Sequence, residues 1–304
     1  MPKAAPPAPV QAVRGLAVLA ESPGEEHAAV ACALGLDSVP LSAEYSDLFL
    51  FQLYPYASVY LGAEGMIGGT ARDRIAGFWH AVGLRPPKEP DHLAALLGLY
   101  ASLIERAESG ESEAEELLSF QAARTLLLEH LCPWVFAWLD RMQELSSGFY
   151  ASWALLLKRF LIEELSGEGS SRCADDAVDS GVVSLQHLRD VPSLPDPRSD
   201  GSESFIKGLL ASISSGMIIT RADLGRIARS LDLGLRAGER RYALEHLIAQ
   251  DAEGTLRALV SEAHRQGNIH KHRIKWLGES SEHLARRCYS TAALLDELAQ
   301  EDLK

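Results

Sequence analysis

Apolar residues at helical spacing constrain the fold of this chain more than any other feature. The clearest series follows Pro90, a residue that a helix tolerates in its first turn. Its members recur every three or four residues, namely Leu93, Leu96, Leu97, Tyr100, Leu103 and Ile104. This spacing places their side chains on one face of an α-helix. Alternating Val- and Ile-rich runs, which indicate strands, are missing, so we predict an all-α protein.

The same spacing predicts helices over most of the remaining chain. Before residue 166 the expected helices cover 13–21, 25–34, 44–53, 71–82, 111–131 with a continuation to 142, and 149–165. Beyond residue 202 they cover 204–214, 221–231, 236–248, 252–265, 269–277 and 281–299. Proline and glycine between or within these ranges are expected to end or interrupt helices, and Pro133 is the clearest case.

Composition divides the chain into four parts. Residues 1–12 are rich in proline and are expected to form a disordered tail, followed by one multi-helix bundle over 13–165. Residues 166–202 are rich in Ser, Gly, Asp and Pro, which predicts a linker around a short element at 182–188. Residues 203–304 return to helical patterns and are expected to form an additional C-terminal helical subdomain.

Charge is spread unevenly between these parts. Residues 203–304 hold 15 Lys and Arg against 14 Asp and Glu, whereas residues 1–202 hold 14 against 28. The acidic body disfavours nucleic acid and anionic membrane surfaces and favours a cationic partner, although a highly charged surface also serves solubility alone.

The cysteines and the longest apolar runs exclude further classes of protein. Cys32, Cys132, Cys173 and Cys288 are far apart and form no C-x-x-C motif, so we expect no metal and no cofactor. They are interpreted as reduced thiols of a cytoplasmic protein. No uncharged apolar run reaches about 18 residues, so no stable membrane insertion is expected.

Six short motifs in a fixed order resemble one known family over residues 45–165. They are Tyr45-x-x-Leu48-Phe49, Pro55-Tyr56-x-Ser58-Val59-Tyr60, Gly68-Gly69, a helix with Phe78, Glu89-Pro90-Asp91-His92-Leu93 and His130-Leu131-x-x-Trp134. Together they are similar to the TorD/DmsD/NarJ-type chaperones that mature molybdenum-containing oxidoreductases. Residues 203–304 are an extension outside the common core of that family.

The resemblance implies an all-helical chaperone of the cytoplasm that is not an enzyme. Such proteins bind the twin-arginine signal peptide, or another part, of the precursor of a molybdopterin-containing catalytic subunit, and hold it for cofactor insertion before export. The sequence leaves undecided whether the protein forms a homodimer in which the two copies exchange elements through a linker such as 166–202.

The resemblance also carries candidate site residues onto this chain. It implies client binding by the pair Asp91 and His92 and by an aromatic lining of Tyr56, Tyr60, Phe78 and Trp79. A twin-arginine peptide joins two guanidinium groups to an apolar segment, so its receptor requires carboxylates beside aromatic faces. Asp73, Glu89 and Asp91 can supply these carboxylates.

Structural roles compete with binding at several of these positions. Asp91 is also placed to stabilise the first turn of the following helix, and His92 to form a structural hydrogen bond. Phe78 and Trp79 at helical spacing are typical of a core.

A different class of function is an alternative for the C-terminal part. Residues 220–235 loosely resemble a helix-turn-helix, which would make the protein a regulator with an acidic helical domain and a DNA-binding module. The segment charge of only +1 disfavours this reading. Catalytic motifs are missing, because no Gly-Lys-Ser/Thr follows the glycines at 65–69 and no nucleophile elbow surrounds a serine.

Overall fold

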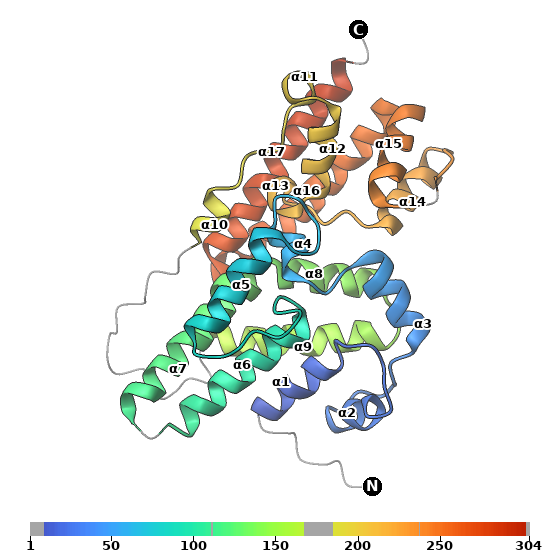
Figure 1. Ribbon diagram of the computed structural model, residues 1–304. Coiled ribbons are helices and arrows are strands. Elements are labelled where there is room, and N and C mark those ends of the chain that lie inside the picture. The colour runs from blue at the N-terminus through green and yellow to red at the C-terminus, as the bar shows by residue number, and fades with distance from the viewer. Residues whose placement is uncertain (1–8, 111, 167–184, 237, 302–304) are drawn as a thin grey trace. The chain divides into compact units, whose positions relative to one another are not determined.

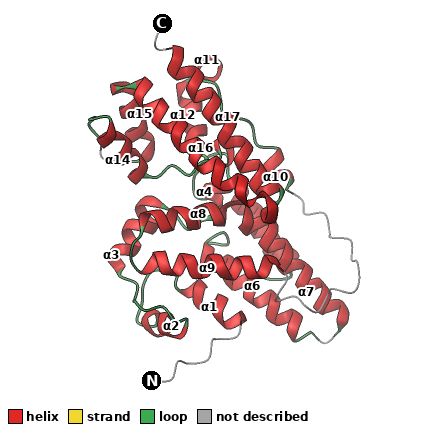
Figure 2. Ribbon diagram, turned by 180° about the vertical axis from the view of Figure 1, so that it is seen from behind, coloured by secondary structure: helices red, strands yellow, loops and turns green. Residues whose placement is uncertain are grey.

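The computed structural model describes residues 9–110, 112–166, 185–236 and 238–301 (Figure 1). Within these ranges the chain forms helices and no strand, as Figure 2 shows, so the all-α prediction is confirmed. The described residues separate into two compact units. The first unit contains 9–57 and 72–166, and the second contains 58–71 and 185–301.

The helices of the first unit and of the segment 58–71 follow the predicted order. They are α1 (Pro9–Val18), α2 (His27–Ala33), α3 (Ser42–Tyr45), the π-helix η1 (Ser46–Gln52), α4 (Ala57–Leu61), α5 (Gly69–Ala81), α6 (Leu93–Glu108), α7 (Glu113–Thr125), the π-helix η2 (Leu126–Leu131), α8 (Cys132–Leu145) and α9 (Phe149–Ser166). Both π-helical segments carry buried side chains, and such segments are uncommon in globular proteins.

Aromatic side chains form the core of the first unit. Trp134, Trp138 and Trp153 are each 2% exposed or less, and their rings meet edge to face at centroid distances of 6.0–6.1 Å. Two of the three indole nitrogens have partners inside the core. The Trp153 indole donates to the carbonyl of Leu16 at 3.2 Å, and the Trp134 indole donates to the carbonyl of His130 at 2.8 Å. The first of these bonds fixes α1 against α9.

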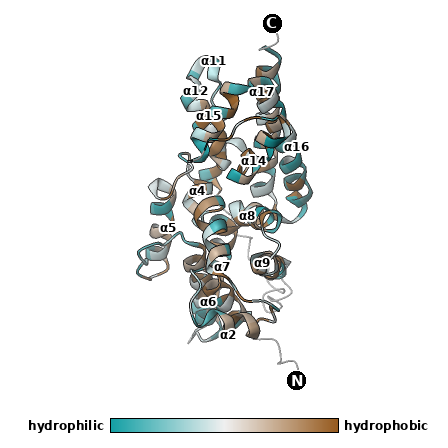
Figure 3. Cartoon of the chain, turned by 90° about the vertical axis from the view of Figure 1, so that its right-hand side faces the viewer, coloured by the Kyte–Doolittle hydropathy of each residue, from teal (hydrophilic) through white to brown (hydrophobic). Residues whose placement is uncertain are grey.

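The second unit is built from α10 (Gln186–Arg189), α11 (Pro197–Asp200), α12 (Ser202–Leu210), α13 (Ser212–Ser215), α14 (Arg221–Ser230), α15 (Arg240–Gln250), α16 (Ala252–Leu277) and α17 (Glu279–Glu301). The hairpin of α16 and α17 carries one apolar face. In Figure 3 both helices show hydrophilic residues in teal and hydrophobic residues in brown. Leu259, Ala263, Cys288, Ala292 and Leu295 belong to the core that this face forms with α12, α14 and α15.

The second unit also contains residues 58–71, which precede the rest of it by more than a hundred positions. The carbonyl of Tyr60 accepts a hydrogen bond from the Ser212 hydroxyl at 3.1 Å, and both residues are buried. A Cβ atom on Gly65 would lie 3.2 Å from the Cα atom of Ala211. Its φ of +62° is also a conformation that favours glycine. The predicted domain division leaves this segment with residues 13–165.

Three expectations about helix limits need correction. Helix α1 begins at Pro9, so residues 9–12 are helical rather than a disordered tail, because Val10 joins Val13, Leu16 and Ala17 on a buried face. Residues 1–8 and the start of the predicted short element at 182–188 lie outside the described residues. Pro133 does not interrupt a helix, since it occupies the first turn of α8.

The third correction concerns the expected separation of helices at 252–265 and 269–277. Helix α16 runs unbroken through Gly267, because this glycine allows close packing on α17. A Cβ atom at Gly267 would lie 3.0 Å from the Cβ atom of Cys288. Across the residues that the structure describes, no helix is both long and apolar enough to span a bilayer.

Candidate functional site

Two short stretches of the first unit are held side by side at the start of α6. The Ala57 amide donates to the carbonyl of Asp91 at 2.9 Å, and the Leu93 amide donates to the carbonyl of Pro55 at 2.8 Å. These bonds form an isolated antiparallel bridge between Tyr56 and His92. The bridge brings the two rings into an edge-to-face contact with centroids 4.9 Å apart.

Glu89 and Trp79 join this pair from the loop before α6 and from α5. The Tyr56 hydroxyl donates to Oε2 of Glu89 at 3.0 Å, and Glu89 itself is exposed. The Trp79 indole donates to the carbonyl of Pro90 at 3.2 Å, which holds its half-buried ring beside the same loop. We refer to Tyr56, Trp79, Glu89, Asp91 and His92 as the bridge cluster.

His92 begins α6 as a capping residue. Its Nδ1 atom accepts a hydrogen bond from the Ala94 amide at 3.1 Å. Burial lowers the pKa of His92, although Glu89, Glu21 and Asp91 act in the opposite direction. A neutral ring is the form that accepts a hydrogen bond at Nδ1, so the cap and the lowered pKa agree. The structural role predicted as an alternative for His92 is therefore present.

Burial also determines the exposure of Asp91 and the pKa of Tyr56. Asp91 is only 1% exposed, whereas Glu89, two residues earlier, lies on the surface. Burial raises the pKa of Tyr56, and the hydrogen bond to Glu89 raises it further. Tyr56 is thus a neutral donor at physiological pH, and it orients the Glu89 carboxylate.

Asp73 is linked to the bridge cluster through Arg72. The Asp73 side chain is 75% exposed, and one of its oxygens lies 3.3 Å from the Arg72 guanidinium. The same guanidinium donates to the carbonyl of Lys88 at 3.1 Å, next to Glu89 in the chain. Asp73 therefore belongs to the same surface as the loop that carries Glu89.

Phe78 and Tyr60 have other neighbours. The Phe78 ring contacts the His130 ring with centroids 4.9 Å apart. Tyr60 is 5% exposed and belongs to the second unit, where its carbonyl is bound by Ser212. The structure thus brings five of the eight predicted residues into one cluster, ties Asp73 to it, and places Phe78 against His130.

Glu21 is a further carboxylate whose charge acts on this region and which the sequence did not indicate. It is exposed just after α1, and its charge acts on both Tyr45 and His92, as that of Glu89 does. Burial is the main cause that raises the pKa of Tyr45, and the two carboxylates add to it. Glu21 and Glu89 are 68 positions apart, so no periodicity or motif could have paired them.

Three arginines of α14 and α15 have partners within the second unit. Arg226 pairs with Asp223 at 2.8 Å, Arg240 donates to the carbonyl of Ile219 at 2.7 Å, and Arg241 pairs with Glu245 at 2.9 Å. The two helices are joined by residues 231–239, nine positions instead of the three or four of a helix-turn-helix. This geometry does not favour the DNA-binding alternative.

Comparison with known proteins finds relatives for a part of this chain. Residues 24–140 match the family described as nitrate reductase delta subunit. The chain is 29% identical over 147 residues to a protein named chaperone protein TorD from Vibrio cholerae, an alignment that covers 45% of this chain and 64% of that protein. It is 30% identical over 129 residues to the chaperone protein TorD of Vibrio vulnificus, which covers 40% and 60%.

These matches are partial in extent. The chain spans 64% of the length of the Vibrio cholerae relative and 60% of that of the Vibrio vulnificus relative. The match to the family ends at residue 140, so residues 185–301 of the second unit lie beyond it. No solved structure gives a significant match to the chain.

Proposed function

We propose that this protein is a chaperone in the maturation of a molybdenum-containing oxidoreductase. Two matches support this proposal: residues 24–140 match the nitrate reductase delta subunit family, and part of the chain is similar to proteins named chaperone protein TorD. It acts by binding and release in the cytoplasm, without bond chemistry. Its client is the precursor of the catalytic subunit, which it holds until the cofactor is inserted.

The part of the client that it binds is a cationic segment, and a twin-arginine signal peptide fits this description best. Glu89, Glu21 and Asp73 place exposed carboxylates around the bridge cluster. A guanidinium group forms its strongest hydrogen bonds with carboxylates, often in pairs. The half-buried rings of Tyr56 and Trp79 offer faces for cation–π contacts, each contributing about 1 kcal/mol.

The observation that carries this proposal is the oriented carboxylate of Glu89. Its Oε2 atom is held by the Tyr56 hydroxyl, while the residue stays exposed. A carboxylate has about four acceptor positions, so a bond from Tyr56 leaves room for an arriving guanidinium. Preorientation lowers the entropy that binding must overcome. Asp91, in contrast, is buried and supports the loop that presents Glu89.

A peptide titration tests this proposal. The probe is a labelled synthetic peptide with two adjacent arginines before an apolar segment. Its binding to the full chain is measured by fluorescence anisotropy. We expect the Glu89→Gln variant to bind about five- to tenfold more weakly, because one charge-assisted contact contributes about 1 kcal/mol at an exposed site. A peptide with glutamines in place of the two arginines should bind to neither protein.

Glu108→Gln provides the matched control. Glu108 is an exposed carboxylate at the far end of α6 in the same unit. Its replacement should leave the dissociation constant unchanged. Equal affinity of the wild type and the Glu89→Gln variant would remove the bridge cluster from the binding site. Failure of the wild type to bind any arginine-containing peptide would remove signal-peptide binding from the proposal.

A further inference from the structure

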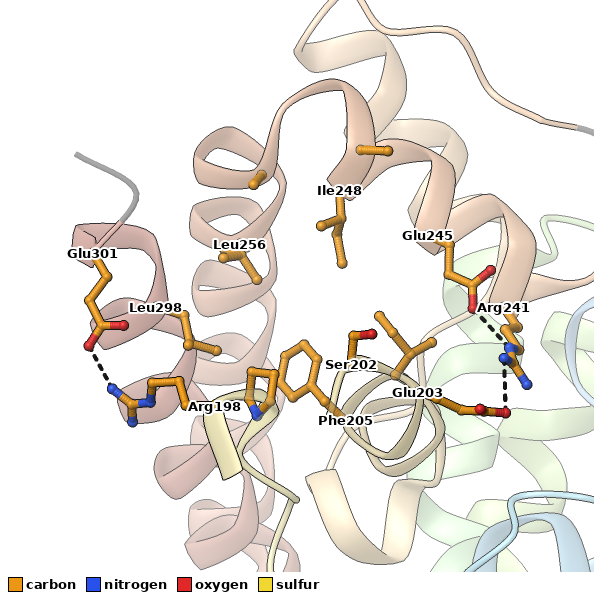
Figure 4. Close-up of a pocket in the computed structure, with 14 residues that line it drawn as sticks. Arg198, Ser202, Glu203, Phe205, Arg241, Glu245, Ile248, Leu256, Leu298 and Glu301 are labelled. Atoms are coloured by element: carbon orange, nitrogen blue, oxygen red, sulfur yellow. Dashed lines mark hydrogen bonds and ion pairs between the residues drawn. The ribbon is translucent and has the colours of Figure 1, made fainter. Parts of the chain in front are cut away.

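A cavity of about 610 Å³ lies in the second unit, between α12, α15, α16 and α17 (Figure 4). Its volume is within the range of about 300–1,000 Å³ that is typical of ligand sites. All the residues that line it belong to the second unit, outside the match to the known family. The cavity is therefore separate from the bridge cluster and does not depend on the function proposed above.

The interior of this cavity is apolar. Phe205 of α12 lies across it from Ile248 of α15 and near Leu256 of α16 and Leu298 of α17. Ile206 of α12 also lines the cavity. Phe205, Ile206 and Leu256 are also part of the buried core, so the floor of the cavity is fixed by packing. Burial of apolar ligand side chains against such a floor makes the free energy of binding more favourable.

Ion-paired groups stand at opposite ends of the cavity, as Figure 4 shows. At one end Arg198 pairs with Asp196 at 2.6 Å, with Glu301 at 2.7 Å and with Glu297 at 3.3 Å. Three carboxylates against one guanidinium make this end negative by two charges.

The other end repeats the excess of carboxylates. Arg241 pairs there with Glu245 at 2.9 Å and with Glu203 at 3.2 Å, which leaves one negative charge. An anionic ligand would have to displace carboxylates from both arginines. A cationic group can instead share the carboxylates that are already oriented.

We propose that this cavity binds a short peptide segment in which a few apolar residues lie between two basic residues. The apolar side chains fill the space above Phe205 and Leu256, and each basic residue meets one of the two acidic ends. Charge at both ends distinguishes such a peptide from an amphiphile with a single charged head. The second unit thus gives the protein a peptide-binding site of its own.

The test is a titration of the full chain with a labelled hexapeptide, Lys-Leu-Leu-Ile-Leu-Lys, blocked at both ends. Two comparison peptides keep its length, one with Glu in place of Lys and one with Ser in place of the apolar residues. We expect the basic apolar peptide to bind at least about tenfold more tightly than either comparison peptide. Raising the salt concentration should weaken its binding.

Variants at the cavity locate the binding. Ala249→Trp places an indole in the cavity from the exposed face of α15 and should abolish binding of the hexapeptide. The double variant Glu245→Gln with Glu301→Gln changes side chains that are 38% and 53% exposed, and it should weaken binding about fivefold or more. Thermal unfolding of each variant should match the wild type, and the double variant keeps the test valid if the first one is destabilised.

Two control variants separate the possible outcomes. Glu282→Gln removes an exposed carboxylate of α17 that does not line the cavity, and it should leave binding unchanged. Glu89→Gln should also leave binding of the hexapeptide unchanged, so failure of this proposal is distinct from failure of the proposed function. Equal binding of the acidic peptide, or full binding by the Ala249→Trp and double variants, would overturn the proposal.

Discussion

His283 shows how burial sets the charge of a single side chain in this protein. It is 2% exposed, and its Nε2 atom donates to the carbonyl of Ile213 at 3.2 Å. Burial, together with the charges of Arg287 and Arg286, lowers the pKa of His283 to about 4, although the hydrogen bond to Ile213 and the charge of Glu279 act in the opposite direction. The buried ring is therefore neutral at physiological pH.

This shift predicts how acid affects stability. Because the folded-state pKa lies below the ordinary value of 6.5, the unfolded chain binds a proton more readily than the folded one. The contribution of His283 to stability is complete above about pH 6.5 and is lost as the pH falls toward about 4. In His283→Gln, whose amide can still donate to Ile213, we expect a shallower fall of the free energy of unfolding over this range.

Denaturant titrations of the second unit at several pH values between 4 and 7 measure this difference. Carboxylates contribute an acid dependence that both proteins share, so only the difference between the two slopes reports His283. Parallel slopes would contradict the prediction.

Residues of the candidate site show where sequence reasoning stops at this scale. The family resemblance indicated Tyr56, Trp79, Asp91 and His92, and the need for carboxylates added Glu89. The structure places these five residues in one cluster. It could not separate the exposed Glu89 from the buried Asp91, because burial depends on the backbone bonds between residues 55–57 and 91–93. Glu21 had no signal at all.

At the scale of elements, close backbone contacts position short helices against long ones. Gly216 ends α13 with a φ of +80°, and a Cβ atom there would lie 2.5 Å from the amide nitrogen of Cys288 and 2.6 Å from the carbonyl oxygen of Leu284. Both atoms belong to the backbone of α17, which cannot yield as a flexible side chain does. The Cys288 thiol also donates to the carbonyl of Gly216 at 3.1 Å.

Gly216→Ala is accordingly expected to lower the free energy of unfolding of the second unit by about 2–4 kcal/mol. Gly225→Ala in α14 is the matched control, because its nearest neighbours lie at 3.5 Å or more. That substitution should be neutral or stabilise by up to about 1 kcal/mol, as expected for alanine in a helix interior. Equal stability of the two variants in denaturant titrations would refute the close contact between α13 and α17.

Elements with long apolar faces were the most predictable part of the fold. The predicted helices at 93–104 and 149–165 agree with α6 and α9, because burial of one face decides both their type and their length. The predicted helix limits were wrong where a glycine or a proline can either end a helix or have another role within it. Gly267 could have ended a helix, but in the structure it allows α17 to approach α16. Pro133 could have broken a helix, but it begins one.

At the scale of the whole molecule, the second unit depends on a segment that lies early in the sequence. Gly65 and Gly68 provide a matched pair within residues 58–71, since both have positive φ angles. A Cβ atom at Gly65 would meet the backbone of Ala211, whereas nothing lies within 4 Å of one at Gly68. Substituting each by alanine therefore separates steric contact from backbone strain.

We expect Gly65→Ala to speed the hydrogen exchange of amides in residues 58–71 and in α13 by about tenfold relative to Gly68→Ala, which corresponds to about 1.4 kcal/mol of opening free energy. Mass spectrometry of peptic fragments measures this exchange in the full chain. Amides of α6 in the first unit serve as the internal control and should exchange at the same rate in both variants. Equal exchange of residues 58–71 in the two variants would contradict the packing of this segment on Ala211.

The membership of residues 58–71 in the second unit also sets an order of events during synthesis. The segment leaves the ribosome early, but its partners begin at residue 185 and end with α17. At about 5–20 residues per second, the 113 residues between positions 71 and 185 take about 6–23 s to translate. The nascent chain must keep a buried tyrosine and a glycine turn without their partners for this time. The second unit can therefore be completed only after nearly the entire chain has left the ribosome.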